Sequence, residues 1–236
     1  MEYVSVLRFI NEKAARGSNM LDDQATKQQS YSEIYKLKKE NASEATKVLT
    51  DAFYDDPLLR YVCEFEGNRL GKTSYIIKSV LSLGIHYGEV WALGNPVIAG
   101  AAIWMPPDFK GISLFRSLRT GIFFEKYVLG KSAAKRYSLF NATTDDLHHK
   151  IAKMPHWYLF VIGIEPSLQG KGLGTKLIKH MLARTDEEKV PVFLTAPNPT
   201  NIGYYEKLGF NVMGKAKVPG SDLVVPGLLR LPSEEF

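Results

Sequence analysis

The sequence has little cysteine and little histidine: among 236 residues there are one cysteine, Cys63, and five histidines. A single cysteine cannot form an internal disulfide, and it cannot supply the thiolates of a cysteine zinc site. We therefore expect no metal centre, and we interpret Cys63 as a small core residue.

Long apolar runs and obvious linkers are also missing. No stretch approaches the roughly twenty residues that span a bilayer, and the N-terminus, with Glu2 and Arg8 around a short apolar stretch, is a poor signal peptide. We expect a cytoplasmic protein without membrane contact. No segment rich in Gly, Pro and Ser divides the chain, which favours a single domain over residues 31–236 after an N-terminal extension, residues 1–30, that is helical or loose.

Charge of one sign is in small excess: 30 Lys and Arg against 25 Asp and Glu give a net charge of +5. This balance suits a ligand with several phosphates, and it also suits weak association with nucleic acid. Because the basic residues are scattered and are not interleaved with aromatics, we interpret them as solvated faces and expect no nucleic-acid partner.

What the chain does contain is an apolar strand that runs into a glycine-rich turn, residues 158–174. A helical pattern follows from Lys171. The first amides of a helix have no partner inside the helix and lie at the positive end of its dipole, so anions bind there. Gly170, Gly172 and Gly174 lack Cβ atoms at alternate positions, which lets a phosphate approach the main chain. We predict a pyrophosphate site, the alternative being a turn that only lets strand and helix pack.

Two nucleotide-binding patterns are excluded by spacing. The dinucleotide fingerprint requires a third glycine where Thr175 stands. The segment Gly67-Asn-Arg-Leu-Gly71-Lys72-Thr73 resembles a nucleoside triphosphate loop, but it has three residues between its glycines where the pattern has four. Glu66 occupies the position of the first glycine, and an acid there would repel phosphate.

The remaining patterns predict both helices and strands. We expect a strand near Tyr31–Lys38, and a helix that starts at a capping box of Asn41 and Glu44 and stops at Asp55-Asp56-Pro57. Further elements are expected as helices from Pro57, over 74–84 and within 111–153, a strand pair over 89–93 and 97–105, and a short buried strand over 190–195.

Two segments carry a resemblance to a known family. Gln-x-x-Gly-x-Gly at residues 169–174, preceded by Gly-Ile-Glu-Pro, resembles the acetyl-CoA motif of the Gcn5-related N-acetyltransferases. Asn201-Ile-Gly-Tyr-Tyr-Glu-Lys-Leu-Gly-Phe210 resembles the second signature of that family. His156-Trp-Tyr-Leu is similar to the start of the motif strand in the subgroup that contains puromycin N-acetyltransferase. Members of that subgroup commonly carry Glu where this chain has Thr195.

The resemblance implies an α/β (α+β) fold, a mixed and mostly antiparallel sheet flanked by helices, with residues 111–153 as a helical insertion before the motif strand. It implies transfer of an acetyl group from acetyl-CoA to a primary amine of a small molecule by direct attack in a ternary complex. Two alternatives stay open: an acetyltransferase acting on protein N-termini or lysines, and a silent module that binds acyl-CoA. We expect a monomer or homodimer. The insertion either forms a wall of the acceptor pocket or only covers the sheet edge.

The resemblance also assigns cofactor contacts. The main chain of Ile162, Gly163 and Ile164 is expected to pair with pantetheine as an added strand would, with an amide facing the thioester carbonyl. The pyrophosphate and the rest of coenzyme A are expected on the amides from Gln169 through Gly170, Lys171, Gly172 and Leu173 to Gly174, the hydroxyl of Thr175, and Asn201.

For the chemistry, Tyr205 occupies the position to which the family assigns the general acid. We expect Tyr204 in the core. The general base stays open. Strand alternation places His156, Tyr158, Phe160, Ile162 and Ile164 on one face, and His156 is the better candidate there because histidine titrates near neutrality. Tyr158 shares that stretch, and a chain of waters is equally compatible with the sequence.

Overall fold

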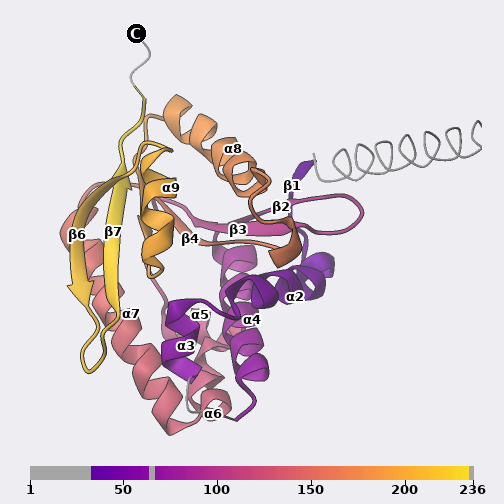
Figure 1. Ribbon diagram of the computed structural model, residues 1–236, viewed down its shortest axis with the longest axis vertical. Coiled ribbons are helices and arrows are strands. Elements are labelled where there is room, and N and C mark those ends of the chain that lie inside the picture. Colours follow the sequence, from indigo (N-terminus) through magenta and orange to yellow (C-terminus); the bar gives the residue numbers. More distant parts are fainter. Residues whose placement is uncertain (1–32, 64–66, 234–236) are drawn as a thin grey trace, which may run out of the picture.

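The computed structural model describes residues 33–63 and 67–233 (Figure 1). The predicted N-terminal extension, residues 1–30, lies outside these residues. Among the described helices, none is long and apolar enough to cross a bilayer.

A seven-stranded sheet with the order β1-β2-β3-β4-β5-β7-β6 organises the fold (Figure 1). Every pair of neighbouring strands is antiparallel except β4 and β5, which are parallel. This confirms the predicted mixed and mostly antiparallel sheet. The strands are β1 (Ile34–Lys36), β2 (Glu89–Leu93), β3 (Gly100–Met105), β4 (Trp157–Ile164), β5 (Val192–Thr195), β6 (Asn211–Lys217) and β7 (Val224–Arg230).

Helices lie on both faces of the sheet. The predicted helical segment within residues 111–153 is confirmed, and the helix expected over 74–84 begins earlier and takes in most of the segment that resembles a nucleotide loop. The helices are α2 (Ala42–Phe53), α3 (Pro57–Cys63), α4 (Arg69–Tyr87), α5 (Leu114–Thr120), α6 (Glu125–Leu129), α7 (Lys131–Ile151), α8 (Leu173–Glu187) and α9 (Ile202–Glu206), with 3-10 turns at Lys39–Asn41, Ile122–Phe124, Pro166–Leu168 and Pro199–Asn201.

The start of α2 differs from the prediction. The side chain of Asn41 makes no capping hydrogen bond. Glu44 Oε1 instead accepts a hydrogen bond from the backbone N–H of Ile98 at 2.9 Å. Because Lys39–Asn41 forms a 3-10 turn, the N–H of Ala42 already bonds the Lys39 carbonyl. The predicted capping box is therefore wrong, and Glu44 ties α2 to the loop before β3.

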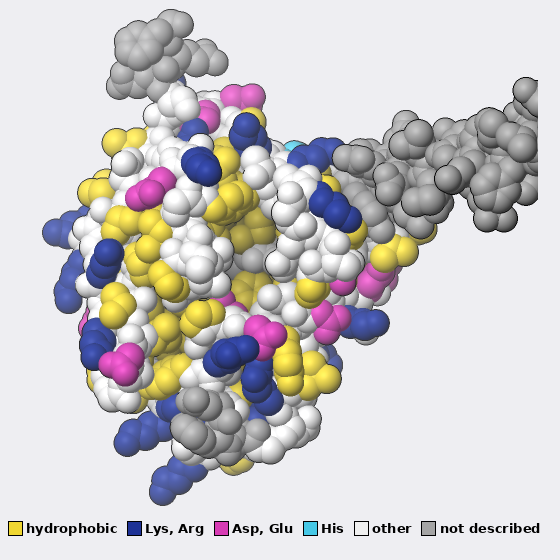
Figure 2. Space-filling model, in the orientation of Figure 1, with side chains coloured by type: hydrophobic (Ala, Val, Ile, Leu, Met, Phe, Trp, Pro, Cys, Tyr) yellow, Lys and Arg dark blue, Asp and Glu magenta, His cyan; other side chains and the backbone are white. Residues whose placement is uncertain are grey.

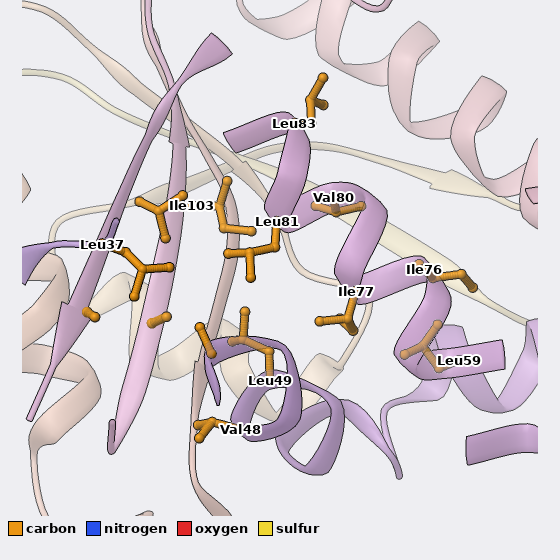
Figure 3. Close-up of a cluster of buried hydrophobic side chains, with 14 of the residues drawn as sticks. Leu37, Val48, Leu49, Leu59, Ile76, Ile77, Val80, Leu81, Leu83 and Ile103 are labelled. Carbon is orange, nitrogen blue, oxygen red and sulfur yellow. The ribbon is translucent and has the colours of Figure 1, made fainter. Parts of the chain in front are cut away.

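One core cluster fills the space between α2, α4 and the sheet. Leu49 of α2, Ile77 and Leu81 of α4 and Ile103 of β3 are all buried and turned toward one another (Figure 3). The helical spacing of these apolar residues produces this stripe, as expected for helices that bury one side. Gly163 of β4 lets α2 approach closely, because an added Cβ would lie 2.8 Å from Leu49 Cδ2.

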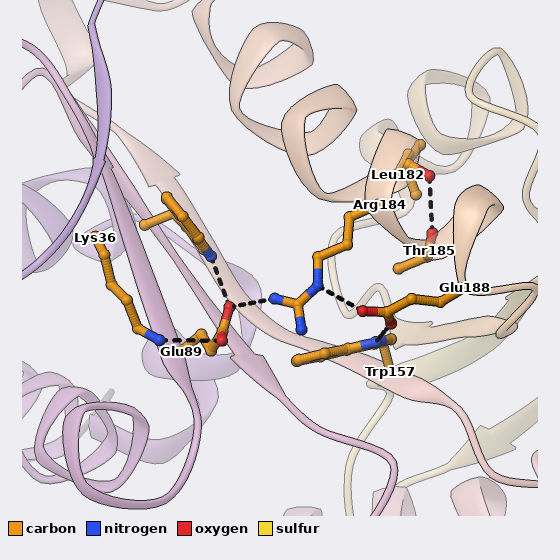
Figure 4. Close-up of polar contacts among 8 residues, drawn as sticks. Lys36, Glu89, Trp157, Leu182, Arg184, Thr185 and Glu188 are labelled. Atoms are coloured by element: carbon orange, nitrogen blue, oxygen red, sulfur yellow. Dashed lines mark hydrogen bonds and ion pairs between the residues drawn. The ribbon is translucent and has the colours of Figure 1, made fainter.

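The second cluster lies on the opposite face, under α8, where Leu177, Ile178 and Met181 are buried. A chain of polar contacts joins the C-terminal end of α8 to the sheet (Figure 4). Arg184 donates to Glu89 at 2.9 Å and to Glu188 at 2.6 Å. Because this chain lies at the end of α8 opposite the glycine turn, we give it a structural role.

Candidate active site

The sheet opens where β4 and β5 diverge. The two strands pair only between Trp157–Leu159 and Val192–Leu194. At the next position Thr195 pairs with Gly227 of β7, while β4 continues to Ile164. Among the described strands, none pairs with residues 160–164 on the β5 side. An extended ligand can therefore add to this free edge of β4.

A β-bulge interrupts β4 just before the opening. Ile103 of β3 pairs with Val161, and the next residue, Trp104, pairs with Leu159. Phe160 is thus the extra residue, left without a partner in β3, which is the arrangement of a β-bulge.

The bulge reverses the alternation of side chains along β4. Tyr158 and Phe160 pack with the α2 and α4 cluster, whereas Ile162 and Ile164 pack with the α8 cluster. The prediction that these four side chains share one face is therefore wrong. The alternation rule assumes an uninterrupted strand, and nothing local in the apolar run marks the extra residue.

The glycine turn presents the start of α8. Gly170 and Gly172 have φ of +75° and +77°, backbone conformations that residues other than glycine adopt only with strain. An added Cβ at either glycine would meet no protein atom within 4 Å. The N–H of Lys176 bonds the carbonyl of Gly172 at 3.0 Å. The amides of Leu173 to Thr175 precede this bond, so they face the open space in front of the helix.

Gln169 and Lys171 differ from the rest of the predicted phosphate site. The Gln169 side chain donates to the Ile164 carbonyl at 3.0 Å, and its backbone N–H donates to Pro166 at 3.3 Å. Gln169 therefore fastens the turn to the end of β4. Lys171 is exposed and does not line the groove described next.

A groove of about 610 Å³ lies between the glycine turn, the end of α2 and α9. Figure 2 shows it as a hollow in the middle of this face with hydrophobic side chains along its walls. Apart from Lys171, every residue predicted to contact the cofactor lines this groove: Ile162, Gly163, Ile164, Gln169, Gly170, Gly172, Leu173, Gly174, Thr175, Asn201 and Tyr205.

A second, smaller cavity of about 150 Å³ adjoins the groove. Both are lined by the same six residues where they meet: Phe53, Asp56, Ile162, Asn198, Asn201 and Tyr205. Away from this junction the smaller cavity is lined by α3, α4, β4, α7 and the segment at the end of β5. Because Tyr137, Phe140 and Thr144 of α7 line it, the predicted helical insertion does form a wall of this cavity.

Tyr205 lies at the junction, with its ring against Tyr204 and Phe210. Burial raises the pKa of Tyr205, and the neighbouring Tyr204 and Asp56 raise it further. The phenol is therefore protonated at neutral pH, which is the state that a proton donor requires.

Tyr204, which we expected in the core, is partly buried against the α8 cluster. It lines the groove, and its hydroxyl is 3.5 Å from Thr175 Oγ1 at the first turn of α8. The two adjacent tyrosines thus face different parts of the site: Tyr204 faces the helix start, and Tyr205 faces the smaller cavity.

Asp56 is a site residue that sequence reasoning missed. Its Oδ1 accepts a hydrogen bond from the Leu58 N–H at 2.9 Å, so it caps α3, and it also lines both the groove and the cavity. Burial raises the pKa of Asp56, although hydrogen bonds from the amides of Leu58 and Leu59 oppose this. An Asp before a Pro-led helix has the pattern of an ordinary cap, so no local signal marked it.

The two candidate bases occupy different places. Tyr158 lines the cavity, and its hydroxyl is 3.4 Å from Thr195 Oγ1. Burial raises the pKa of Tyr158 to about 12, which makes it a neutral hydrogen-bond donor. His156 does not line either hollow: its Nε2 is 2.6 Å from His148 Nε2 and its Nδ1 is 2.6 Å from the Met154 carbonyl. His156 thereby joins the start of β4 to α7.

A sheet that opens between two parallel strands, with a glycine turn and a helix start at the opening, defines an acyltransferase fold. A model of the acetyltransferase (GNAT) family matches residues 137–210. An N-acetyltransferase of Schizosaccharomyces pombe, itself uncharacterized, is 30% identical over 173 residues, which cover 70% of this chain and 69% of the relative. The chain belongs to the GNAT family and is an acyltransferase, an N-acetyltransferase of the GNAT kind.

Other relatives are similar over shorter stretches or in fold alone. A 5-NmdU N-acetyltransferase from Pseudomonas phage PaMx11 is 33% identical over 64 residues, 27% of this chain and 46% of the relative. A structure described as a histone acetyltransferase and related acetyltransferase from Corynebacterium glutamicum has a TM-score of 0.63 at 20% identity, covering 86% of this chain and 97% of that chain. Arylalkylamine N-acetyltransferase 2 from Aedes aegypti has a TM-score of 0.58 at 14% identity, covering 85% and 99%.

Proposed function

We propose that this protein is a cytoplasmic enzyme that moves an acetyl group from acetyl-CoA to the primary amine of a small molecule by direct attack in a ternary complex. The observation that carries this proposal is the junction of the groove and the smaller cavity at Asp56 and Tyr205. Direct attack requires that both substrates be held with their reacting atoms in contact. Because the groove and the cavity adjoin and share six lining residues, ligands bound in the two would meet at this junction.

The residues of the groove fit acetyl-CoA, which supplies the acetyl thioester. The amides at the start of α8, with the open turn at Gly170 and Gly172, suit a pyrophosphate. The free edge of β4 from Ile162 to Ile164 suits the amides of pantetheine. We propose Thr175 and Asn201, which line the same groove, as further cofactor contacts.

Asp56 and Tyr205 would handle the protons. An acceptor arrives as an ammonium, and Asp56 is placed to take the proton that frees its nitrogen lone pair. The nitrogen then bonds to the acetyl carbon while the carbon–sulfur bond breaks, and Tyr205 is placed to protonate the departing thiolate. The nitrogen loses its second proton to solvent or to the phenolate left on Tyr205, because Asp56 already holds the first. We prefer Asp56 to His156 as the base because His156 does not line the cavity, and we give Tyr158 a substrate-positioning role.

The small volume of the cavity, about 150 Å³, favours a small acceptor over a protein. An acetyltransferase for chain termini or lysines would need an open groove for a polypeptide, whereas α7 closes the far side here. Two of the fold relatives bear names of small-amine enzymes, the arylalkylamine enzyme above and a polyamine N-acetyltransferase of Drosophila melanogaster. We place the chain near the puromycin N-acetyltransferase subgroup on His156-Trp-Tyr-Leu alone, and we expect a monomer or homodimer.

The test combines cofactor binding with turnover. Acetyl-CoA at a hundred times its Kd should stabilise the fold by about 2.7 kcal/mol and raise the Tm by about 5 to 10 °C. Release of coenzyme A thiol should then depend on an added small amine. Absence of a thermal shift at millimolar acetyl-CoA would contradict the cofactor site. A shift without thiol release from any amine in a broad panel would instead indicate a silent binding module.

A further inference from the structure

We propose that the acceptor is a primary amine with a single positive charge, attached to an apolar body about the size of a phenyl ring, and that amines with a second positive charge are disfavoured. This inference rests on the proposed acetyltransferase function and names its substrate class. It comes from the distribution of charge along the 150 Å³ cavity.

The one negative charge lies at the groove end of the cavity. Among the described residues that line it, Asp56 is the only carboxylate, and no Lys, Arg or His lines it. Asp56 also lines the groove, so we place the attacking nitrogen beside this residue. An ammonium group beside Asp56 is paired and is in position for transfer.

Away from Asp56, the described residues that line the cavity offer no carboxylate to a second cation. The wall there includes Ile76, Ile77, Val80 and Phe140, and burying an unpaired ammonium against such side chains is strongly unfavourable. Two acids outside the lining act electrostatically on residues of the wall: the buried Glu125 on Tyr137, and the exposed Asp145 on Tyr158. Burial raises the pKa of Glu125 to about 8, so this group is mostly uncharged at neutral pH.

The size and polarity of the cavity define the body of the acceptor. A closed apolar cavity of about 150 Å³ in another protein is large enough for benzene. Asn141 and Thr144 add polar atoms to this wall, but Thr144 Oγ1 already donates to the Phe140 carbonyl at 3.1 Å. The Asn141 side chain forms a hydrogen bond with Tyr137. The cavity therefore suits a ring or a short alkyl chain, with tolerance for one neutral polar group.

Matched amines test the charge rule on the wild-type protein. Hexylamine and 1,6-diaminohexane have the same carbon chain and differ by one ammonium, and 2-phenylethylamine and agmatine extend the comparison. We expect kcat/KM, followed by thiol release, to be at least tenfold higher for hexylamine and 2-phenylethylamine than for the two dications. Equal or better turnover of a dication would overturn this inference and leave the acetyltransferase function intact. Absence of turnover with every amine would count against both.

Two variants locate the charges. Asp56→Asn retains a good cap for α3 and removes the carboxylate that we propose as both the ammonium partner and the base, so kcat/KM for hexylamine should fall at least tenfold while the Kd for acetyl-CoA stays within twofold. Asn141→Asp adds an acid of the same shape to the cavity wall, and it should raise the ratio of diamine to monoamine kcat/KM at least fivefold. Asn211→Asp is the matched control, because Asn211 is exposed on β6, and it should leave the ratio of diamine to monoamine kcat/KM unchanged. An unchanged ratio in a folded Asn141→Asp protein would contradict the proposal.

Discussion

Asp56 and Tyr205 lie together in the wall shared by the groove and the smaller cavity, and the charge of Asp56 raises the pKa of Tyr205. One residue comes from the loop before α3 and the other from α9. A cation placed beside Asp56 offsets its charge, and this lowers the pKa of the phenol again. If the smaller cavity holds the amine, as we propose, its arrival would make Tyr205 a better proton donor and would couple occupancy of the cavity to the chemical step.

Replacing Tyr205 by phenylalanine tests the proton-donor role. General acids contribute about 10² to 10⁴ in rate, so Tyr205→Phe should lower kcat at least a hundredfold while the Kd for acetyl-CoA stays within twofold. Steady-state thiol release and isothermal titration measure the two quantities. Tyr204→Phe is the matched control: because its hydroxyl lies near Thr175 at the start of α8, it should affect cofactor affinity more than kcat. Equal kcat in wild type and Tyr205→Phe would remove the acid role.

The features that were predictable from the sequence are those fixed by nearby residues. Gly170 and Gly172 adopt left-handed backbone conformations, a preference that glycine carries by itself. The helices of residues 111–153 follow from the spacing of their apolar residues, because helical periodicity is a local signal. The residues of the turn and of the strand before it line one groove because the two segments are adjacent in the chain.

The features that escaped prediction depend on contacts between distant segments. The bulge at Phe160 is a mismatch between β4 and β3, which are separated by the whole helical insertion. Glu44 bonds Ile98, a residue 54 positions away, in place of the local capping box. Asp56 lines the candidate site because the folded chain brings it to the same cavity as residues of α9 and β4. A single sequence gives no signal for such pairings.

A second prediction concerns the glycine turn and the affinity for acetyl-CoA. Gly172→Ala places a Cβ on a residue with φ of +77°, which costs about 1 to 2 kcal/mol and shifts the amides that face the groove. We expect acetyl-CoA to bind at least tenfold more weakly, as measured by titration calorimetry. Gly111→Ala is the matched control, because Gly111 has φ of +75° and equally open space but does not line the groove. It should lose similar stability and keep its affinity. The same loss of affinity in both variants would argue against a phosphate site at this turn.

The contact between His148 and His156 predicts how stability depends on pH. The ring of His148 stacks on Phe193 at 4.6 Å, and burial, together with the neighbouring His156 and His149, lowers the pKa of His148 to about 4. In the unfolded chain His148 has an ordinary pKa near 6.5, so the unfolded state takes up a proton first as the pH falls. The stabilisation is thus complete above about pH 6.5 and is lost as the pH falls toward 4.

Urea unfolding at pH 7.5, 5.5 and 4.5 should show this decline in wild type and a shallower one in His148→Gln. The exposed neighbour provides the control: His149 is the smallest of the three causes that lower the pKa of His148, so His149→Gln should stay closer to the wild-type slope than His148→Gln does. Parallel curves for wild type and His148→Gln would show that another group sets the pH dependence.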